Sequence, residues 1–187
     1  AAAAVHARAV AAAGAARHKQ PRRIVLIRHG ESEGNTDTSV YCRIPDNLIR
    51  LTAAGRAQAV HAGRELGALL RGETVVFLVS PYVRSKETLK HLLAGAALHP
   101  DQYAVREEPR LREQDMSNFQ DDQQVRRCMH ERRVFGSFFY RMPNGESGAD
   151  VYDRVTSLWS SLFRAFHSER CPDNIVLVTH GLTMRLM

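Results

Sequence analysis

Cysteine is scarce in this chain of 187 residues, with only Cys42, Cys128 and Cys171 spread along its length. No Cys-x-x-Cys pair occurs, so the sequence predicts neither a disulfide framework nor a structural zinc site. A reducing compartment, and hence a cytoplasmic location, is the simplest expectation. No apolar run approaches the roughly 20 residues that cross a bilayer, so no membrane partner is expected.

Acidic residues are missing from the first 23 positions, which hold five of the 26 Lys and Arg residues. The rest of the chain has 21 Lys and Arg and 20 Asp and Glu, so most of the formal net charge of +6 comes from the first 23 residues. Because the body is nearly neutral, no nucleic-acid partner is predicted. Residues 1–23 are interpreted as a low-complexity basic tail that is either disordered or a targeting segment. Targeting to an organelle therefore stays open as an alternative to a cytoplasmic location.

Two catalytic motifs are also absent. The chain has no Gly-x-x-x-x-Gly-Lys-Ser/Thr loop, which argues against a nucleotide triphosphatase. Ser32 has no Gly-x-Ser-x-Gly elbow around it, which argues against a serine hydrolase.

Three short apolar runs are present at residues 24–27, 75–79 and 175–178. They are rich in β-branched residues and too short for helices, and their continuous apolarity predicts parallel strands covered on both faces. Helical patterns lie between them. The sequence therefore predicts an α/β fold, a three-layer sandwich with a mostly parallel central sheet and helices on both faces.

Capping residues and apolar spacing place the helices. One helix is expected from the N-cap Thr52 to about Leu70, and another over residues 85–94. A third begins at a capping box formed by Ser147 and Asp150. Its predicted buried face is Val151, Val155, Leu158, Leu162 and Phe166. Residues 114–149 fit neither period and are interpreted as an inserted, partly helical cap.

Charged residues follow each apolar run. Arg28 and His29 end the first, Arg84 lies just after the second, and His180 and Gly181 end the third. The carboxyl ends of parallel strands share one crevice, so these side chains should meet there. Two arginines and two histidines make a positive pocket suited to a phosphate dianion, and one that would repel a divalent metal ion.

Chemistry at such a pocket needs a nucleophile and an acid. Neutral His29 could attack phosphorus to form a phosphohistidine, while His180 and the arginines stabilise the developing charge. Glu113 is the best-placed proton donor for the leaving alkoxide, and Glu31 and Asp115 are weaker candidates. The residues expected to bind the substrate are Arg28, Ser32, Asn35, Arg84 and Gly181, with Gly30 and Gly34 allowing close backbone approach.

Four segments resemble signatures of the histidine phosphatase superfamily, the phosphoglycerate mutase-like family. They are RHGESEGN (28–35), LTAAGRAQA (51–59), SPYVRSKET (80–88) and VTHG (178–181), in the family's order. The resemblance implies that His29 is phosphorylated and that Arg28, Arg84 and His180 form the phosphate pocket. It also places Asn35 at a phosphate contact and Glu113 at the proton donor, and implies that no metal is used.

The stretch around Glu113 points to a branch of this family. RLREQDMSNFQ (110–120) lacks the mutase pattern and, with residues 135–155, resembles the broad-range acid phosphatases. We therefore expect a phosphomonoester hydrolase that transfers the phosphoryl group through a phosphohistidine to water, acting on a small phosphorylated metabolite or another phosphomonoester without a cofactor.

Two alternatives stay open. The first is a phosphoglycerate mutase primed by bisphosphoglycerate, since Arg126, Arg127, Arg132 and Arg133 in the cap could grip a second anionic group. The second is a phosphate-binding module without turnover. The family domain is expected over residues 24–187, with the cap at about 114–149 and an incomplete C-terminal end, because the family continues past the second histidine motif. The oligomeric state does not follow from the sequence.

Overall fold

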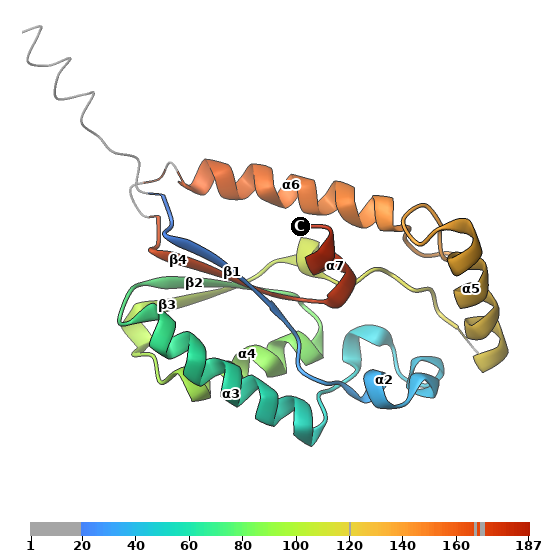
Figure 1. Ribbon diagram of the computed structural model, residues 1–187, viewed down its shortest axis with the longest axis horizontal. Helices are drawn as coiled ribbons and strands as arrows, with labels where there is room; N and C mark the ends of the chain where they lie inside the picture. Colours follow the sequence, from blue (N-terminus) through green and yellow to red (C-terminus); the bar gives the residue numbers. More distant parts are fainter. Residues whose placement is uncertain (1–19, 120, 167, 169–170) are drawn as a thin grey trace, which may run out of the picture.

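The computed structural model describes residues 20–119, 121–166, 168 and 171–187, so the first 19 residues of the predicted tail lie outside it. Within the described residues, four parallel strands form one sheet: β1 (Arg23–Arg28), β2 (Val75–Val79), β3 (Tyr103–Glu107) and β4 (Asn174–Thr179). Their order is β1-β4-β2-β3, which puts β4 at the centre beside β1 and β2 (Figure 1). The strands therefore end at the same edge.

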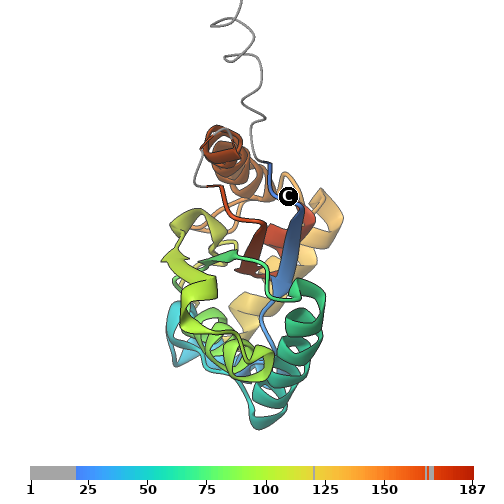
Figure 2. The ribbon, with the colours of Figure 1, turned by 90° about the vertical axis from the view of Figure 1, so that its left-hand side faces the viewer.

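Helices cover both faces of the sheet (Figure 2). On one face, α3 (Ala53–Leu70) and α4 (Val83–Ala96) bury a cluster that includes Phe77, Leu92 and Val176. On the other, α6 (Gly148–Phe166) packs on a second cluster, and the short α7 (Gly181–Arg185) follows β4. The predicted three-layer α/β fold is confirmed.

Hydrogen bonds confirm the predicted N-terminal caps of two helices, α3 and α6. The Thr52 hydroxyl accepts from the Gly55 N–H at 3.0 Å and begins α3. At α6 the Ser147 N–H donates to the Asp150 carboxylate at 2.7 Å, and the Asp150 N–H donates back to the Ser147 hydroxyl at 3.2 Å. The buried side chains of α6 are those predicted: Val151, Val155, Leu158, Leu162 and Phe166.

Two features of the sheet differ from the sequence-based prediction. β3 was not predicted, because its sequence YAVRE is short, largely polar and mostly exposed. β1 is not covered on both faces: it pairs only with β4 among the described residues, and Ile24 and Leu26 are each 37% exposed. Val25 and Ile27, on the other face, pack on the α3–α4 core. Edge position, which hydropathy does not report, explains both differences.

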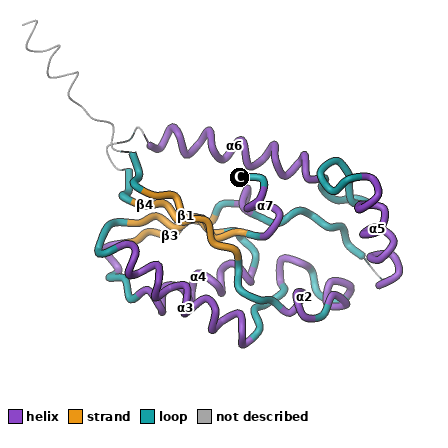
Figure 3. The backbone as a smooth tube through the Cα atoms, in the orientation of Figure 1, coloured by secondary structure: helices purple, strands orange, loops and turns teal. Residues whose placement is uncertain are grey.

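The predicted cap stands apart from the sheet, at the far end of α6 (Figure 3). It contains α5 (Asp122–Phe135) and has its own small core of Phe119, Cys128 and Met142. Short elements complete the chain: α2 (Glu33–Thr36) and the 3-10 turns η1 (Thr38–Cys42), η2 (Asp46–Leu48), η3 (Pro100–Gln102) and η4 (Pro109–Leu111). Within the described part of the chain, no helix combines the length and apolarity needed to cross a membrane.

Candidate active site

The two motif histidines meet at the carboxyl edge of the sheet. The strand register pairs Arg28 with Thr179, and the His29 N–H donates to the Thr179 carbonyl at 2.9 Å. His180 follows Thr179 directly, so the ring centroids of His29 and His180 lie 5.1 Å apart. Two residues 151 positions apart are thus brought together by the pairing of β1 with β4.

His29 is held in a single tautomer. Its Nδ1 lies 2.7 Å from the Gly30 carbonyl oxygen, which can only accept, so Nδ1 carries the proton and Nε2 keeps its lone pair. The ring is 8% exposed. Burial, with the positive charges of Arg84 and Arg28, lowers the pKa of His29 from 6.5 to about 4. His29 is therefore neutral at physiological pH, with one free nitrogen.

His180 is fully buried, and its surroundings also favour the neutral form. Its Nε2 lies 2.7 Å from the Ser80 hydroxyl and 3.2 Å from the Ser85 hydroxyl. Burial is the main cause that lowers the pKa of His180, followed by the charge of Arg84. Its Nδ1 has no hydrogen-bond partner among the described residues. A buried polar atom without a partner costs free energy.

Arg84 lies 2% exposed at the first turn of α4. Its Nη1 donates to the backbone carbonyl of Asp46 at 2.6 Å and to the Asp46 carboxylate at 2.7 Å. Its Nε is buried and has no hydrogen-bond partner in the part of the chain that the structure describes. Asp46 thus anchors the Nη1 side of the guanidinium.

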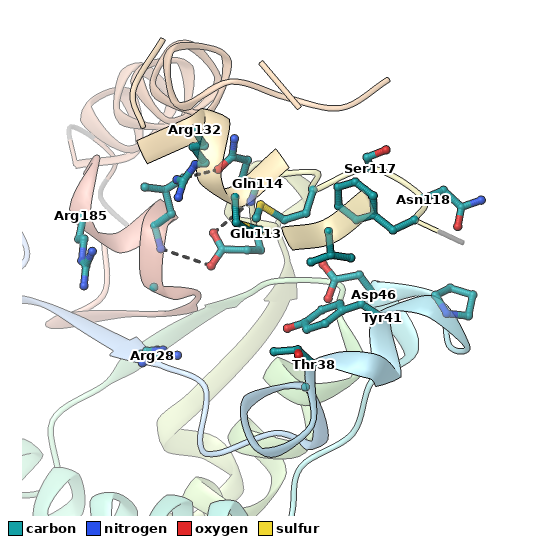
Figure 4. Close-up of a pocket in the computed structure, with 18 residues that line it drawn as sticks. Arg28, Thr38, Tyr41, Asp46, Glu113, Gln114, Ser117, Asn118, Arg132 and Arg185 are labelled. Carbon is teal, nitrogen blue, oxygen red and sulfur yellow. Dashed lines mark hydrogen bonds between the residues drawn. The ribbon is translucent and has the colours of Figure 1, made fainter. Parts of the chain in front are cut away.

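Glu113 and Arg28 line the same cavity (Figure 4). The Glu113 carboxylate accepts from the N–H of Leu182 and of Thr183, both at 3.3 Å, at the start of α7. Of the three acid candidates, Glu113 alone lines the cavity described next. Glu31 instead accepts from the Thr52 hydroxyl at 2.6 Å, and Asp115 is exposed.

A cavity of about 420 Å³ opens beside the histidine pair. Arg28, Glu113 and Gly181 belong to its wall. His29, Arg84 and His180 do not line it, but His29 and His180 are the chain neighbours of Arg28 and Gly181, and Arg84 bonds to the lining residue Asp46. The η1–η2 segment supplies Tyr41 and Asp46, and the cap supplies the opposite wall (Figure 4). The predicted cationic residues are therefore divided between the wall of this cavity and the buried positions next to it.

Other predicted binding residues lie elsewhere. Ser32 is fully buried as the N-cap of α2, and its N–H and hydroxyl both donate to Asn35 Oδ1 at 3.0 Å. Neither Ser32 nor Asn35 lines the cavity. Gly34 does, but a Cβ there would lie 2.7 Å from the Tyr41 ring, so in this structure its lack of a side chain makes room for Tyr41.

Tyr41, Asp46 and Gln114 were not identified from the sequence as site residues. Tyr41 and Asp46 lie in a segment without helix or strand periodicity, and the contact of Asp46 with Arg84 spans 38 positions. For Gln114, the only indication in the sequence is its position next to Glu113. Nothing in the spacing of the sequence indicates the other two.

Comparisons with known proteins identify the family of this chain. The family model for the histidine phosphatase superfamily (branch 1) matches residues 24–187. The phosphoglycerate mutase-like protein AT74H of Arabidopsis thaliana is 44% identical over 89% of this chain. The broad-range acid phosphatase DET1 of Saccharomyces cerevisiae is 33% identical over 92% of this chain and 79% of its own length.

Solved structures include a mycobacterial glucosyl-3-phosphoglycerate phosphatase in complex with VO3. This chain is similar to that structure, with a TM-score of 0.64 and 25% sequence identity. The match covers 87% of this chain and 77% of the other. The chain spans 64% of the length of AT74H, so it corresponds to part of that plant protein.

Proposed function

Because the chain belongs to the histidine phosphatase superfamily, we propose that it hydrolyses phosphomonoesters through a phosphohistidine at His29. The observation that carries this proposal is the state of His29, a neutral imidazole whose Nδ1–H is bonded to Gly30 and whose Nε2 is free. A nucleophilic histidine needs this arrangement, because attack by Nε2 leaves a cation whose remaining N–H already has an acceptor.

In the first step, the Nε2 lone pair of His29 attacks phosphorus in line and the phosphorus–oxygen bond to the leaving group breaks. The transferring oxygens are stabilised by Arg28, by the free Nε–H of Arg84 and by Nδ1–H of His180. This role requires the tautomer in which His180 carries its proton on Nδ1 and Nε2 accepts from the Ser80 hydroxyl, 2.7 Å away. The leaving alkoxide takes a proton from Glu113.

In the second step, water attacks the phosphoryl group from the side that the leaving group has vacated. The Glu113 carboxylate takes a proton from this water, the phosphorus–nitrogen bond breaks, and inorganic phosphate leaves. The electron pair of that bond returns to Nε2, so His29 regains the tautomer in which Nδ1 donates to Gly30. No group beyond the substrate, water and the named side chains is needed for the atoms to balance.

The test is chemical trapping with matched variants. A phosphate ester labelled in its phosphoryl group should leave label on the protein that survives alkali and is lost in acid, as for a phosphohistidine. His29→Asn should abolish both labelling and turnover, whereas His61→Asn, on an exposed side chain of α3, should change neither. Undiminished turnover in His29→Asn would refute the mechanism, and turnover without labelling would refute the covalent step.

The same assay tests the acid. Glu113→Gln should lower kcat by ~10²–10⁴ for alkyl phosphates, whose leaving groups need a proton. The loss should be much smaller for 4-nitrophenyl phosphate, whose leaving group departs as an anion. An equal loss with both esters would contradict the role of Glu113 as proton donor.

A second candidate function is a phosphoglycerate mutase primed by bisphosphoglycerate. It is favoured by two cavity arginines, Arg132 and Arg185, that have no carboxylate partner among the described residues and could hold a second anion. Isomerisation of phosphoglycerate faster than phosphate release, stimulated by bisphosphoglycerate, would identify the mutase. Phosphate release without isomerisation would identify the hydrolase.

A further inference from the structure

The segment that carries Glu113 has no regular secondary structure beyond the 3-10 turn η4. Its backbone is held by side chains of other elements instead. The carbonyl oxygen of Leu111 accepts from the Thr179 hydroxyl at 2.8 Å, and that of Arg112 accepts from the Thr183 hydroxyl at 2.7 Å. These two bonds fix the segment to the end of β4 and to α7.

Arg154 of α6 holds the next carbonyl oxygen on each side of this pair. Its Nη1 donates to the carbonyl of Arg110 at 2.6 Å, and its Nη2 donates to the carbonyl of Glu113 at 3.1 Å. The Arg154 side chain is only 10% exposed. One guanidinium therefore spans residues 110–113, and one of its contacts is the backbone of the proposed proton donor itself.

The guanidinium is in turn oriented by Glu146, which lies just before α6. Both Nε and Nη2 of Arg154 donate to the Glu146 carboxylate, each at 3.1 Å. The same carboxylate accepts from the Asp115 N–H at 3.0 Å and from the Arg112 side chain. Because the guanidinium is a rigid planar fork, these bonds together with the two backbone contacts fix its orientation.

Resting on the proposed function, we propose that Arg154 is a positioning residue for the catalytic acid. It holds the backbone of Glu113 so that the carboxyl group reaches the leaving-group oxygen. A proton donor acts only within hydrogen-bond distance of the atom that it protonates. A misplacement of about 1 Å can cost about 10²-fold in rate. Since no helix or strand fixes Glu113, loss of Arg154 should allow such a misplacement.

The charge of Arg154 offers a different route to the same site. Burial is the main cause that lowers the pKa of His180, followed by the charges of Arg84, His29 and Arg154. A change at His180 would act on the transferring oxygens and hence on every ester. A displaced proton donor slows only those esters whose leaving group needs a proton. The two routes therefore differ in how the rate depends on the leaving group.

The experiment compares benzyl phosphate, whose leaving group needs a proton, with 4-nitrophenyl phosphate, whose leaving group does not. Arg154→Gln should lower kcat/KM for benzyl phosphate by about 10- to 100-fold, with a much smaller loss for 4-nitrophenyl phosphate. Both esters are measured on one sample, so an unfolded fraction cancels in the ratio of the two kcat/KM values. An equal loss with both esters would overturn the proposal.

A double-mutant cycle shows whether Arg154 acts through Glu113. In Glu113→Gln the proton donor is already lost, so adding Arg154→Gln should leave the ratio of the two kcat/KM values unchanged. A further fall in this ratio would mean that Arg154 acts through another group, and it would overturn the proposal.

Two more variants separate geometry from charge and from packing. Arg154→Lys keeps the charge but cannot reach both carbonyls and the carboxylate at once, so it should lose most of the ratio. Arg110→Gln is the matched control. The Arg110 side chain pairs with Glu108 at 2.7 Å and donates to Ser161 of α6 at 2.9 Å, and none of its hydrogen bonds among the described residues reaches Glu113. The proposal is overturned if Arg154→Lys keeps the wild-type ratio or if Arg110→Gln loses it.

Failure of the proposed function would be recognised separately. If the wild type hydrolyses neither ester, the position of Glu113 is read from the amide NMR signals of Leu182 and Thr183, whose N–H groups donate to its carboxylate. These signals should shift as Glu113 ionises in the wild type and in Arg110→Gln, and much less in Arg154→Gln. A shift in Arg154→Gln as large as in the wild type would overturn the proposal.

Discussion

At the scale of single residues, the protonation of His29 controls the chemistry proposed for this site. The Gly30 carbonyl accepts a hydrogen bond from Nδ1–H of His29, and burial with two nearby arginines disfavours a second proton on the ring. The imidazole is therefore available as a nucleophile over a wider acidic range than a surface histidine would be.

This arrangement predicts how activity depends on pH. The pKa of His29 is lowered from 6.5 to about 4, so the neutral form persists as the pH falls and is lost only below about pH 4. The kcat/KM for 4-nitrophenyl phosphate, corrected for ionisation of the ester, should have its acidic limb near pH 4. A limb near pH 6.5 would mean that His29 titrates as an exposed residue, contrary to its burial.

Folding stability should depend on the same shift. The unfolded chain binds a proton at His29 near pH 6.5, whereas the folded protein does so only near pH 4, so lowering the pH between these values favours unfolding. His29→Asn should accordingly weaken the fall in stability over this window, without removing the contributions of other groups.

At the scale of elements, α6 joins the sheet to the cap. Its apolar stripe packs on one face of the sheet, and its capping box starts it next to the end of the cap. A long amphipathic helix held along most of its length provides a rigid support, so the cap wall of the cavity is positioned by packing rather than by loops alone.

A pair of α6 variants tests how strongly this packing contributes. Leu158 is 1% exposed in the cluster with Leu111 and Leu177, so Leu158→Ala should lower the free energy of unfolding by about 2–5 kcal/mol. Phe163→Ala removes more atoms from the same helix, but its side chain is 56% exposed and the loss should be below about 1 kcal/mol. Urea titrations would measure both, and equal losses would contradict the assigned packing.

At the scale of the whole molecule, the cationic end of the candidate site is assembled from β1, α4 and the residues after β4. None of these elements alone carries the two histidines and two arginines. Under the proposed function, an anion bound there would contact all three elements and should stabilise them together.

Binding of inorganic phosphate should therefore raise the melting temperature. At a concentration 100 times its Kd, phosphate should add about 2.7 kcal/mol to the free energy of unfolding. Arg28→Gln should show a smaller rise at the same concentration, while Arg133→Gln, outside the site, should match the wild type. Absence of any rise at tens of Kd determined by calorimetry would contradict a site that exists only in the folded state.

The sequence by itself determined the fold class, the helix caps, the buried stripe of α6 and the family. These depend on local periodicity, capping chemistry and motifs of consecutive residues, all of which are present before the chain folds. The convergence of Arg28, His29, Arg84 and His180 was also predictable, because it follows from the parallel pairing of strands whose ends carry them.

Only the tertiary structure decided which strand lies at the edge, that Asp46 anchors Arg84, and that Arg132 alone among the four arginines of α5 lines the cavity. Each of these features depends on contacts between segments far apart in the chain. Such contacts produce no periodic pattern in the sequence from which they could be predicted. Ser32 was predicted to bind the substrate because of its place in the motif. That place did not indicate that its hydroxyl would be buried in a helix cap.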